Sequence, residues 1–149
     1  MSKTFIMLKP DSVERDLVYT VFEYLKKQNL TVECMDIQKA TAEKLDEHYA
    51  EVFARFDESF RKNMQDYFVG KTVVPMVLSG ENAVETVRKL IGATNPASAE
   101  KGTVRGDLSD DSYDKAGAEN RALHNLIHAS DSDENAKRET KIWLPQYEF

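Results

Sequence analysis

The sequence of 149 residues has few of the features that mark secreted, membrane or duplex-binding proteins. Its one cysteine, Cys34, cannot form an internal disulfide, which argues against a small disulfide-stabilised domain. No apolar run approaches the roughly 20 residues of a membrane-spanning helix. The apolar run at residues 5–8 is also too short for the core of a signal peptide. We therefore expect a cytoplasmic protein without a membrane partner.

Positive charge is also scarce. The 20 Lys and Arg residues are outnumbered by 26 Asp and Glu, for a formal net charge of −6. This balance argues against a protein that binds duplex nucleic acid non-specifically, because such proteins carry a basic excess. It does not exclude a small anionic ligand, because a few clustered cations can form a local positive pocket.

Both common glycine-rich phosphate loops are absent: there is no Gly-x-x-x-x-Gly-Lys-Ser/Thr and no Gly-x-Gly-x-x-Gly. If phosphates bind, side chains rather than a backbone cradle must hold them. At this length, and with a hydrophobic fraction of 41%, we expect one domain covering residues 1–149.

Short apolar runs alternate with amphipathic segments along the chain. Residues 4–8, 30–38, 73–78 and 123–128 are predicted strands. Helical spacing predicts helices near 18–27, from Thr41 as N-cap to residue 49, from 83 to a stop at Gly92, and from Ser132 as N-cap to 143. This order predicts an α/β chain in the form of an α+β sandwich. A ferredoxin-like split βαβ fold fits, with a four-stranded antiparallel sheet covered by helices. Residues 109–122, rich in Asp, Ser, Gly and Ala, are expected to form an exposed loop or a partly helical excursion.

The three histidines differ in their surroundings. His48 falls in a helical pattern, which favours an ordinary surface histidine. His124 and His128 are four residues apart, which on a helix would suggest a zinc pair. On the predicted strand the two lie roughly 13 Å apart, too far to share a metal, so no metal site is expected.

His128 ends an apolar run and is followed by Ala129-Ser130-Asp131-Ser132, a turn and helix-cap cluster. A histidine between a strand and a helix start is well placed in a cleft. Glu139, seven residues after the expected N-cap, could hold one ring nitrogen and leave the other free to attack. Spacing alone leaves a nucleophilic and a structural His128 equally open.

A second group of residues is basic. Lys9 ends the first predicted strand, Arg88 lies on a predicted helix, and Arg105 lies in Gly-Thr-Val-Arg-Gly-Asp. Arginine binds phosphate bidentately and lysine binds it as a point charge. Thr94, in Gly-Ala-Thr-Asn-Pro, could donate to phosphate from a loop. Any one of these taken alone would usually be a solvated surface residue.

Taken together, and in this order, several segments resemble the nucleoside diphosphate kinase family over nearly the whole chain. They are residues 5–11, 48–49, 73–77, 92–96, 102–107 and 125–132. The last, Asn-Leu-Ile-His-Ala-Ser-Asp-Ser, is the most specific and favours His128 as the nucleophile.

The resemblance implies a magnesium-dependent enzyme that moves the γ-phosphoryl group of ATP to nucleoside diphosphates through a pros-phosphohistidine at His128. Glu139 would orient the ring and Tyr49 would lie near the phosphohistidine. The remaining roles concern the nucleotide: phosphate binding by Lys9, Arg88, Arg105 and Thr94, and contacts to the sugar by Asn125 and Lys9.

The resemblance also implies a base site in which Phe60 stacks on the base and Met64 completes the clamp; the less favoured alternative is that Phe60 is an ordinary core residue. Mg²⁺ would arrive bridging the nucleotide's phosphates, so no protein cage is expected. Family members are homo-oligomers built from dimers, as tetramers or hexamers. Neither a membrane nor a specific nucleic acid is expected as a partner.

Four departures from the family pattern leave rival interpretations open. Ser12 replaces a glycine, and Glu58-Ser59-Phe60-Arg61 stands where many members have Arg-Pro-Phe-Phe, with Arg61 as a possible substitute for the missing arginine. Extra residues separate Tyr49 from Asp57, and residues 109–124 form an insertion. One rival is a catalytically weak nucleotide-binding regulatory or scaffold protein of the same fold. The other is a phosphohistidine carrier that donates to a protein.

Overall fold

A computed structural model describes all residues, 1–149, and contains one antiparallel sheet. Its strands are β1 (Ser2–Leu8), β2 (Thr31–Met35), β3 (Gln38–Lys39), β4 (Thr72–Gly80) and β5 (Ile127–Ala129). The strand order is β2-β4-β1-β5, and the two-residue β3 pairs with β4. The predicted antiparallel sheet covered by helices is confirmed, with β3 added beside the four-stranded path.

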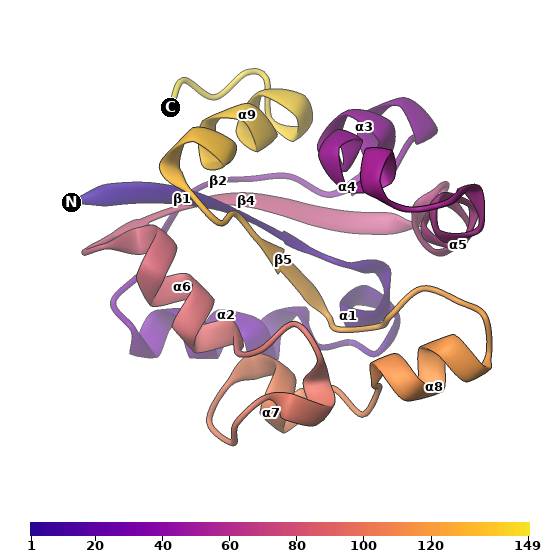
Figure 1. Ribbon diagram of the computed structural model, residues 1–149. Helices are drawn as coiled ribbons and strands as arrows, with labels where there is room; N and C mark the ends of the chain where they lie inside the picture. The colour runs from indigo at the N-terminus through magenta and orange to yellow at the C-terminus, as the bar shows by residue number, and fades with distance from the viewer.

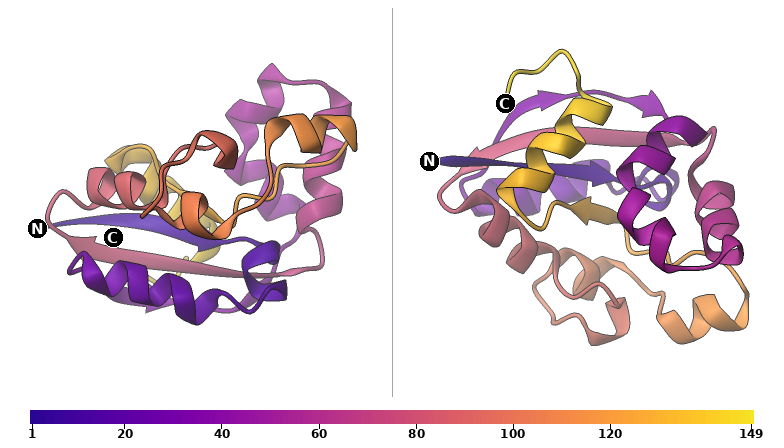
Figure 2. Two further views of the ribbon diagram at one scale, coloured as in Figure 1. Left: turned by 90° about the horizontal axis from the view of Figure 1, so that it is seen from below. Right: turned by 45° about the horizontal axis from the view of Figure 1, so that its top comes forward.

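Alternation along β1 sends side chains into two separate cores. Ile6 and Leu8 point to one face, and Phe5 and Met7 point to the other; all four are fully buried. Helices α2 (Val18–Lys27) and α6 (Ala83–Ile91) cover the first face. Helices α3 (Ala42–His48), α5 (Glu58–Phe68) and α9 (Asp133–Trp143) cover the second (Figures 1 and 2). The period of two along the strand therefore sets which helices pack where.

Several helix ends follow the expected capping rules. The hydroxyls of Thr41 and Ser132 accept hydrogen bonds from Lys44 N and Asn135 N, so the predicted N-caps of α3 and α9 are confirmed. Gly92, with φ of +88°, ends α6 as expected. A Cβ at this position would lie 2.5 Å from Thr103 Oγ1, so only glycine fits there.

Five further short elements connect these layers: α1 (Pro10–Glu14), α4 (Ala50–Arg55), η1 (Pro96–Ser98), α7 (Val104–Leu108) and α8 (Tyr113–Ala118). Helix α8 lies in the segment expected to be a loop or partly helical. Periodicity did not indicate α1, α4, α5 or α7. None of the helices combines the length and apolar character that crossing a bilayer requires.

The strand predicted for residues 123–128 begins only at Ile127, so that prediction was wrong for its first four residues, 123–126. Leu126 instead has φ of +74°, an unusual conformation for a branched side chain. Its backbone is held by the turn that follows β1. Asp11 Oδ2 accepts from Leu126 N at 3.1 Å, while Lys9 N and Ser12 Oγ donate to Leu126 O at 2.9 and 2.6 Å. Ser12, which replaces the family glycine, is therefore part of this contact.

Asp11 offers a direct test of this contact. It is 6% exposed, and its other oxygen accepts a hydrogen bond from the Tyr67 hydroxyl. We expect Asp11→Ala to lower the free energy of unfolding by roughly 2–4 kcal/mol, because two buried donors lose their acceptor. Urea denaturation measures the change. The control Asp114→Ala, at an exposed position on α8, should stay within about 0.5 kcal/mol of the wild type. A loss equally small for Asp11→Ala would contradict the assignment.

Candidate active site

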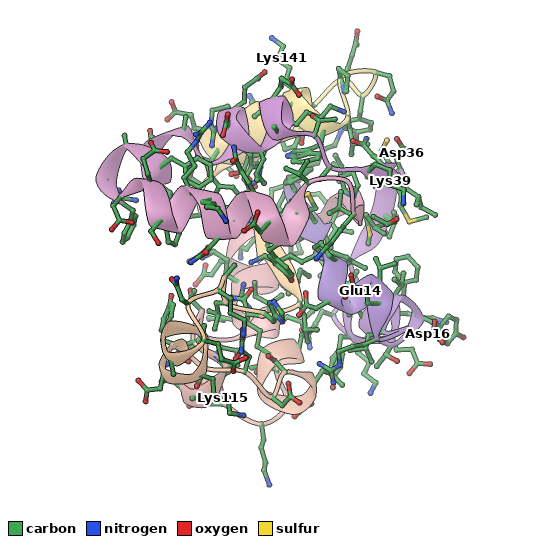
Figure 3. The ribbon with its side chains drawn as sticks, turned by 90° about the vertical axis from the view of Figure 1, so that its right-hand side faces the viewer. Glu14, Asp16, Asp36, Lys39, Lys115 and Lys141 are labelled. Atoms are coloured by element: carbon green, nitrogen blue, oxygen red, sulfur yellow. The ribbon has the colours of Figure 1, made fainter.

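Beside β5 the structure contains a cavity of about 450 Å³. Residues of α9 and α8 both line it. Figure 3 shows these two helices at opposite ends of the molecule, where they can be found by the labels of Lys141 in α9 and Lys115 in α8. All ten site residues expected from the sequence line this one cavity: Lys9, Tyr49, Phe60, Met64, Arg88, Thr94, Arg105, Asn125, His128 and Glu139.

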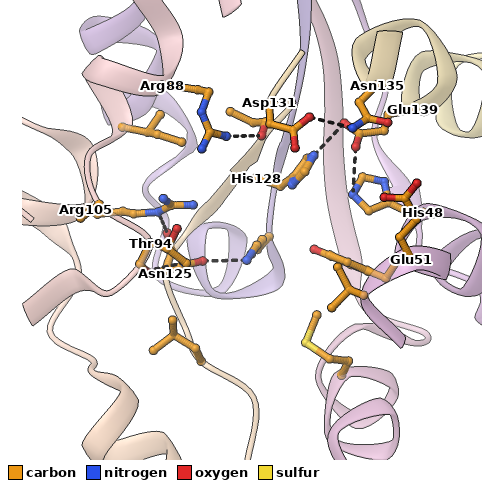
Figure 4. Close-up of a pocket in the computed structure, with 18 of the residues that line it drawn as sticks. His48, Glu51, Arg88, Thr94, Arg105, Asn125, His128, Asp131, Asn135 and Glu139 are labelled. Carbon is orange, nitrogen blue, oxygen red and sulfur yellow. Dashed lines mark hydrogen bonds and ion pairs between the residues drawn. The ribbon is translucent and has the colours of Figure 1, made fainter. Parts of the chain in front are cut away.

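His128 occupies the middle of β5, opposite Met7, and its side chain is 18% exposed. Its Nε2 lies 2.8 Å from Glu139 Oε1 (Figure 4). The Ser130 hydroxyl donates to the same oxygen. A carboxylate only accepts hydrogen bonds, so Nε2 carries the ring hydrogen. The lone pair is therefore on Nδ1, which has no hydrogen-bond partner in the protein.

His48 is not the surface residue that its helical pattern suggested. It is 4% exposed and lines the cavity, because Leu45 and His48 share the buried face of α3. Trp143 Nε1 donates to its Nδ1 at 2.9 Å. Burial, followed by nearby positive charge such as that of Arg138, holds the pKa of His48 well below its ordinary value, so the ring is neutral.

His48, His128 and Glu139 form a cluster whose possible ligand atoms all lie within 4.8 Å of one another. The arrangement suggests a transition-metal site, but the tautomer of His48 argues against it. Because the indole N–H of Trp143 occupies Nδ1, the proton is on Nε2, the nitrogen that lies 4.0 Å from Glu139 Oε2. A protonated ring nitrogen has no lone pair for a metal.

Lys9 and Asn125 form the floor of the cavity. Lys9 Nζ donates to Asn125 Oδ1 at 2.7 Å, and Asn125 Nδ2 donates to Thr94 O at 2.9 Å. Burial, followed by the charge of Arg105, lowers the pKa of Lys9 to about 7. An anion in the cavity would favour the protonated form of this lysine.

Arg105 both holds backbone segments together and places a positive charge in the cavity. Its guanidinium donates to Asn125 O, Gly92 O and Ile127 O at 3.2, 3.0 and 2.6 Å. Guanidinium has five N–H donors, so two remain for a ligand. Burial, then the charge of Arg88, lowers the pKa of Arg105 to about 10, which leaves it charged at neutral pH.

Arg88 and Thr94 complete this wall of the cavity. Arg88 projects from the exposed side of α6, and its Nη1 lies 3.4 Å from Ala129 O. Figure 4 shows Arg88, Arg105 and Thr94 on one side of His128, and His48 and Glu139 on the other. The cations therefore face the open side of the imidazole.

The opposite end of the cavity is aromatic. Tyr49 lies with its ring centroid 6.3 Å from that of His128, and burial raises the pKa of its phenol, which stays protonated. Phe60 is half-buried and stacks on Phe56 at 4.7 Å, while Met64 is 8% exposed. Phe60 thus both lines the cavity and packs against the core, so the two interpretations from the sequence overlap.

Arg61 does not reach the cavity. It pairs with Asp46 at 2.8 Å and with Glu58 at 3.6 Å. Arg55, at the end of α4, lines the cavity instead and forms no hydrogen bond or ion pair. Sequence reasoning missed Arg55 because it paired the family motif with residues 58–61. The spacing of six residues after Tyr49 on a helical segment was the available signal. Tyr113, from the 109–124 insertion, also lines the rim.

Comparisons with known proteins agree with this geometry. A family model described as "Nucleoside diphosphate kinase" matches residues 2–149. The nucleoside diphosphate kinase of Streptococcus uberis is 36% identical over 144 residues, covering 97% of this chain and 94% of that protein. A solved structure of the Borrelia burgdorferi enzyme, a transition-state mimic with bound vanadate and ADP, has a TM-score of 0.90 at 30% identity, covering 96% of this chain and 86% of that one. The Pyrobaculum aerophilum enzyme has a TM-score of 0.86 at 35% identity, covering 95% and 94%.

The neutral, buried His48 predicts a specific acid sensitivity. Below about pH 6.5, the ordinary pKa of histidine, the unfolded chain binds a proton on His48 and the folded chain does not. The free energy of unfolding should therefore fall as the pH decreases, by up to about 1.4 kcal/mol per pH unit from this residue alone. His48→Gln, which cannot titrate, should show a shallower slope between pH 6.5 and 5 in urea denaturation. Parallel slopes for the two proteins would contradict a neutral His48.

Proposed function

The chain belongs to the nucleoside diphosphate kinase family, and on that premise we propose that it transfers the γ-phosphoryl group of ATP to nucleoside diphosphates through His128. Membership makes it a phosphotransferase that acts on nucleoside phosphates. The observation that carries the proposal is His128 itself. Glu139 binds its Nε2 at 2.8 Å, and its Nδ1 has no protein partner in a cavity that Lys9, Arg88 and Arg105 also line.

The chemistry follows from this tautomer. The Nδ1 lone pair of His128 attacks the γ-phosphorus, and an N–P bond forms. The bond from phosphorus to the β–γ bridging oxygen breaks, and its electron pair leaves with the nucleoside diphosphate. No proton has to depart, because Nε2–H stays bonded to Glu139, whose negative charge offsets the positive charge that develops on the ring. A second diphosphate then takes the phosphoryl group by the reverse step, which is a ping-pong scheme.

The cations supply most of the remaining catalysis, since phosphoryl transfer depends chiefly on positioning and charge stabilisation. Lys9, Arg88 and the two free N–H groups of Arg105 bind the phosphates, and the Thr94 hydroxyl donates a further hydrogen bond. Arg55 takes the place of the arginine missing at position 58. Asn125 and Lys9 contact the sugar hydroxyls, and Tyr49 lies beside the phosphohistidine. The shared cavity supports these roles.

The base lies at the aromatic end, stacked on Phe60 and bordered by Met64. Stacking on an aromatic face contributes on the order of 1–3 kcal/mol and accepts any base, because every base has a π-face. Low base selectivity is the expected consequence. The partly exposed ring of Phe60 supports this position.

Mg²⁺ is proposed to arrive with the nucleotide. Among the carboxylates lining the cavity, Glu139 is committed to His128 and Ser130, which leaves Glu51 and Asp131. Mg²⁺ usually keeps several waters and binds one or two carboxylates together with substrate phosphates. Two available carboxylates are too few to enclose the metal in protein ligands alone, but they are enough for a Mg²⁺ ion that is bound mainly by nucleotide phosphates and water. When bound, Mg²⁺ neutralises phosphate charge.

Assembly and location are proposals as well. A cytoplasmic homo-oligomer built from dimers, a tetramer or hexamer, follows from the family. The outer strand β2 supports self-association, because Val32, Met35 and the nearby Ile37 are 39%, 44% and 66% exposed along an unpaired sheet edge. A mass from light scattering distinguishes tetramer from hexamer.

The two rival functions, a phosphohistidine carrier and a regulatory or scaffold protein, have less support than the enzyme. A phosphohistidine carrier that donates to a protein needs no base site, whereas Phe60, Thr94 and Arg105 line the same cavity as His128. A regulatory or scaffold protein without turnover would not need the 2.8 Å contact that fixes the His128 tautomer. ATP-to-GDP transfer in a coupled assay separates both rivals from the enzyme.

Labelling provides the primary test. Incubation with γ-labelled ATP alone should place acid-labile, alkali-stable phosphate on His128, because the phosphoryl group stays on the protein until an acceptor arrives. His128→Ala should lose the label and the transfer while it still binds ADP. His124→Phe, at a histidine whose ring nitrogens make no hydrogen bond, should keep both. Label on a serine, or no label on the wild type, would exclude the proposal.

Arg55 and Arg61 form a matched pair for the phosphate site. Arg55→Gln should weaken MgADP binding roughly three- to tenfold, because an exposed charge loses its contact with phosphate. Arg61→Gln removes the same charge from a side chain bound to Asp46 outside the cavity, so it should leave the affinity within twofold, about 0.4 kcal/mol. Isothermal titration calorimetry measures both. Equal losses of affinity in the two variants would mean that the overall charge of the protein, and not a contact from Arg55, is responsible.

A further inference from the structure

His48 presents a buried hydrogen-bond donor that the mechanism above does not use. Its Nδ1 accepts from Trp143 Nε1 at 2.9 Å, so its proton is on Nε2. That Nε2 is buried and has no hydrogen-bond partner. It points into the site already occupied by the nucleophile, since the His48 and His128 ring centroids are 4.4 Å apart.

The atom that faces this donor is an acceptor with no hydrogen bond. Glu139 Oε1 accepts from both His128 and Ser130, whereas Oε2 accepts from neither. Oε2 lies 4.0 Å from His48 Nε2 and 3.6 Å from the Arg138 guanidinium. Arg138 directs its N–H groups instead to the carbonyls of Glu47 and His48, at 3.0 and 3.3 Å. A buried donor without a partner and an oxygen of the Glu139 carboxylate therefore face each other about 1 Å beyond hydrogen-bond distance, and the unpaired donor is costly if the arrangement is permanent.

We propose that His48 is a positioning residue for phosphoryl transfer: its Nε2–H donates to Glu139 Oε2 in the transition state of the transfer to His128 and for as long as His128 carries the phosphoryl group. This inference rests on the proposed function of His128. As positive charge develops on the His128 ring, Glu139 is drawn into tighter contact, and the second donor fixes the carboxylate from its other oxygen. Glu139 then cannot release His128 Nε2, so the ring cannot turn and only Nδ1 receives phosphate. No proton moves, because His48 keeps Nε2–H throughout.

The alternative is that His48 serves only as a core residue that accepts from Trp143. The two amide substitutions separate these roles. Asparagine carries its amide at the position of ring Nδ1, so it can still accept from the indole but cannot reach Glu139. Glutamine extends to the position of Nε2 and can donate to Glu139. Both variants lose the aromatic ring, but asparagine has one methylene fewer than glutamine, so the isomer of the phosphohistidine, and not the rate alone, distinguishes the two roles.

The experiment compares His48→Asn with His48→Gln in single-turnover transfer from ATP and in the ³¹P NMR signature of the phosphoprotein. His48→Asn should slow transfer roughly ten- to hundredfold, as expected for one lost hydrogen bond to a charged group. Part of its phosphate should appear as the Nε2-linked isomer. His48→Gln should keep the Nδ1-linked isomer alone and transfer within a few-fold of the wild type. Equal rates and a single isomer in both variants would overturn the proposal.

A measurement on the wild type covers the case in which a variant does not fold. With ¹⁵N-labelled histidine, the ring shifts should identify His48 as the Nε2–H tautomer, and its Nε2–H signal should move downfield when His128 is phosphorylated. A proton on Nδ1, or an unchanged signal, would overturn the inference. If the wild type takes no phosphate on His128, the proposed function fails first, and the two failures are distinct.

Discussion

The site depends on the hydrogen bonds by which the β1–α1 turn holds the backbone of Leu126. Three groups from residues 9–12 bind the backbone N–H and carbonyl of Leu126, in a different segment, and they keep Leu126 at φ of +74°. Such a conformation costs on the order of 1–3 kcal/mol for a non-glycine residue. In return, Asn125 and His128, which flank it, both reach the same cavity. Lys9 Nζ, from the same turn, binds Asn125 there. The strain and the assembly of the site therefore have one cause.

The charges of the cavity are arranged on two sides of His128. Glu139 is the buried anion, and it is satisfied on Oε1 by His128 and Ser130. Arg88 and Arg105 lie across the imidazole from it, whereas Arg138 lies 3.6 Å from its Oε2. The second histidine beside Glu139, His48, is held neutral by burial. Arg105 also fixes three backbone carbonyls of the neighbouring segments. A loss of activity on replacing Arg105 would therefore mix phosphate binding with architecture, unlike a loss at Arg55.

The sequence predicts a feature well when the residues that determine it are close together in the chain. Thr41, Gly92 and Ser132 act on their own helix ends, so their roles were visible in short patterns. The strand predicted at 123–128 was wrong for residues 123–126, because apolar content favours a strand whereas a carboxylate 115 residues away decides the conformation of Leu126. His48 was read as a surface residue because its partner, Trp143, is 95 residues distant. Arg55 was missed because the family segment was matched to residues 58–61, which left Arg55 among the residues counted as extra. The site residues were found through motif resemblance, since spacing alone left His128 undecided.

The 109–124 insertion leaves the site intact because its polar side chains bind mainly to one another. Asp111 binds Arg121 through both oxygens at 2.7 and 2.9 Å and accepts from His124 N at 2.8 Å. His124 then stacks on Tyr67, whose hydroxyl donates to Asp11. The entropic cost of extra loop length grows only slowly, and the end of the insertion is tied to the same aspartate that holds Leu126. The added residues therefore reach the rim of the cavity through Tyr113 without displacing Asn125, which favours the enzyme over the scaffold interpretation.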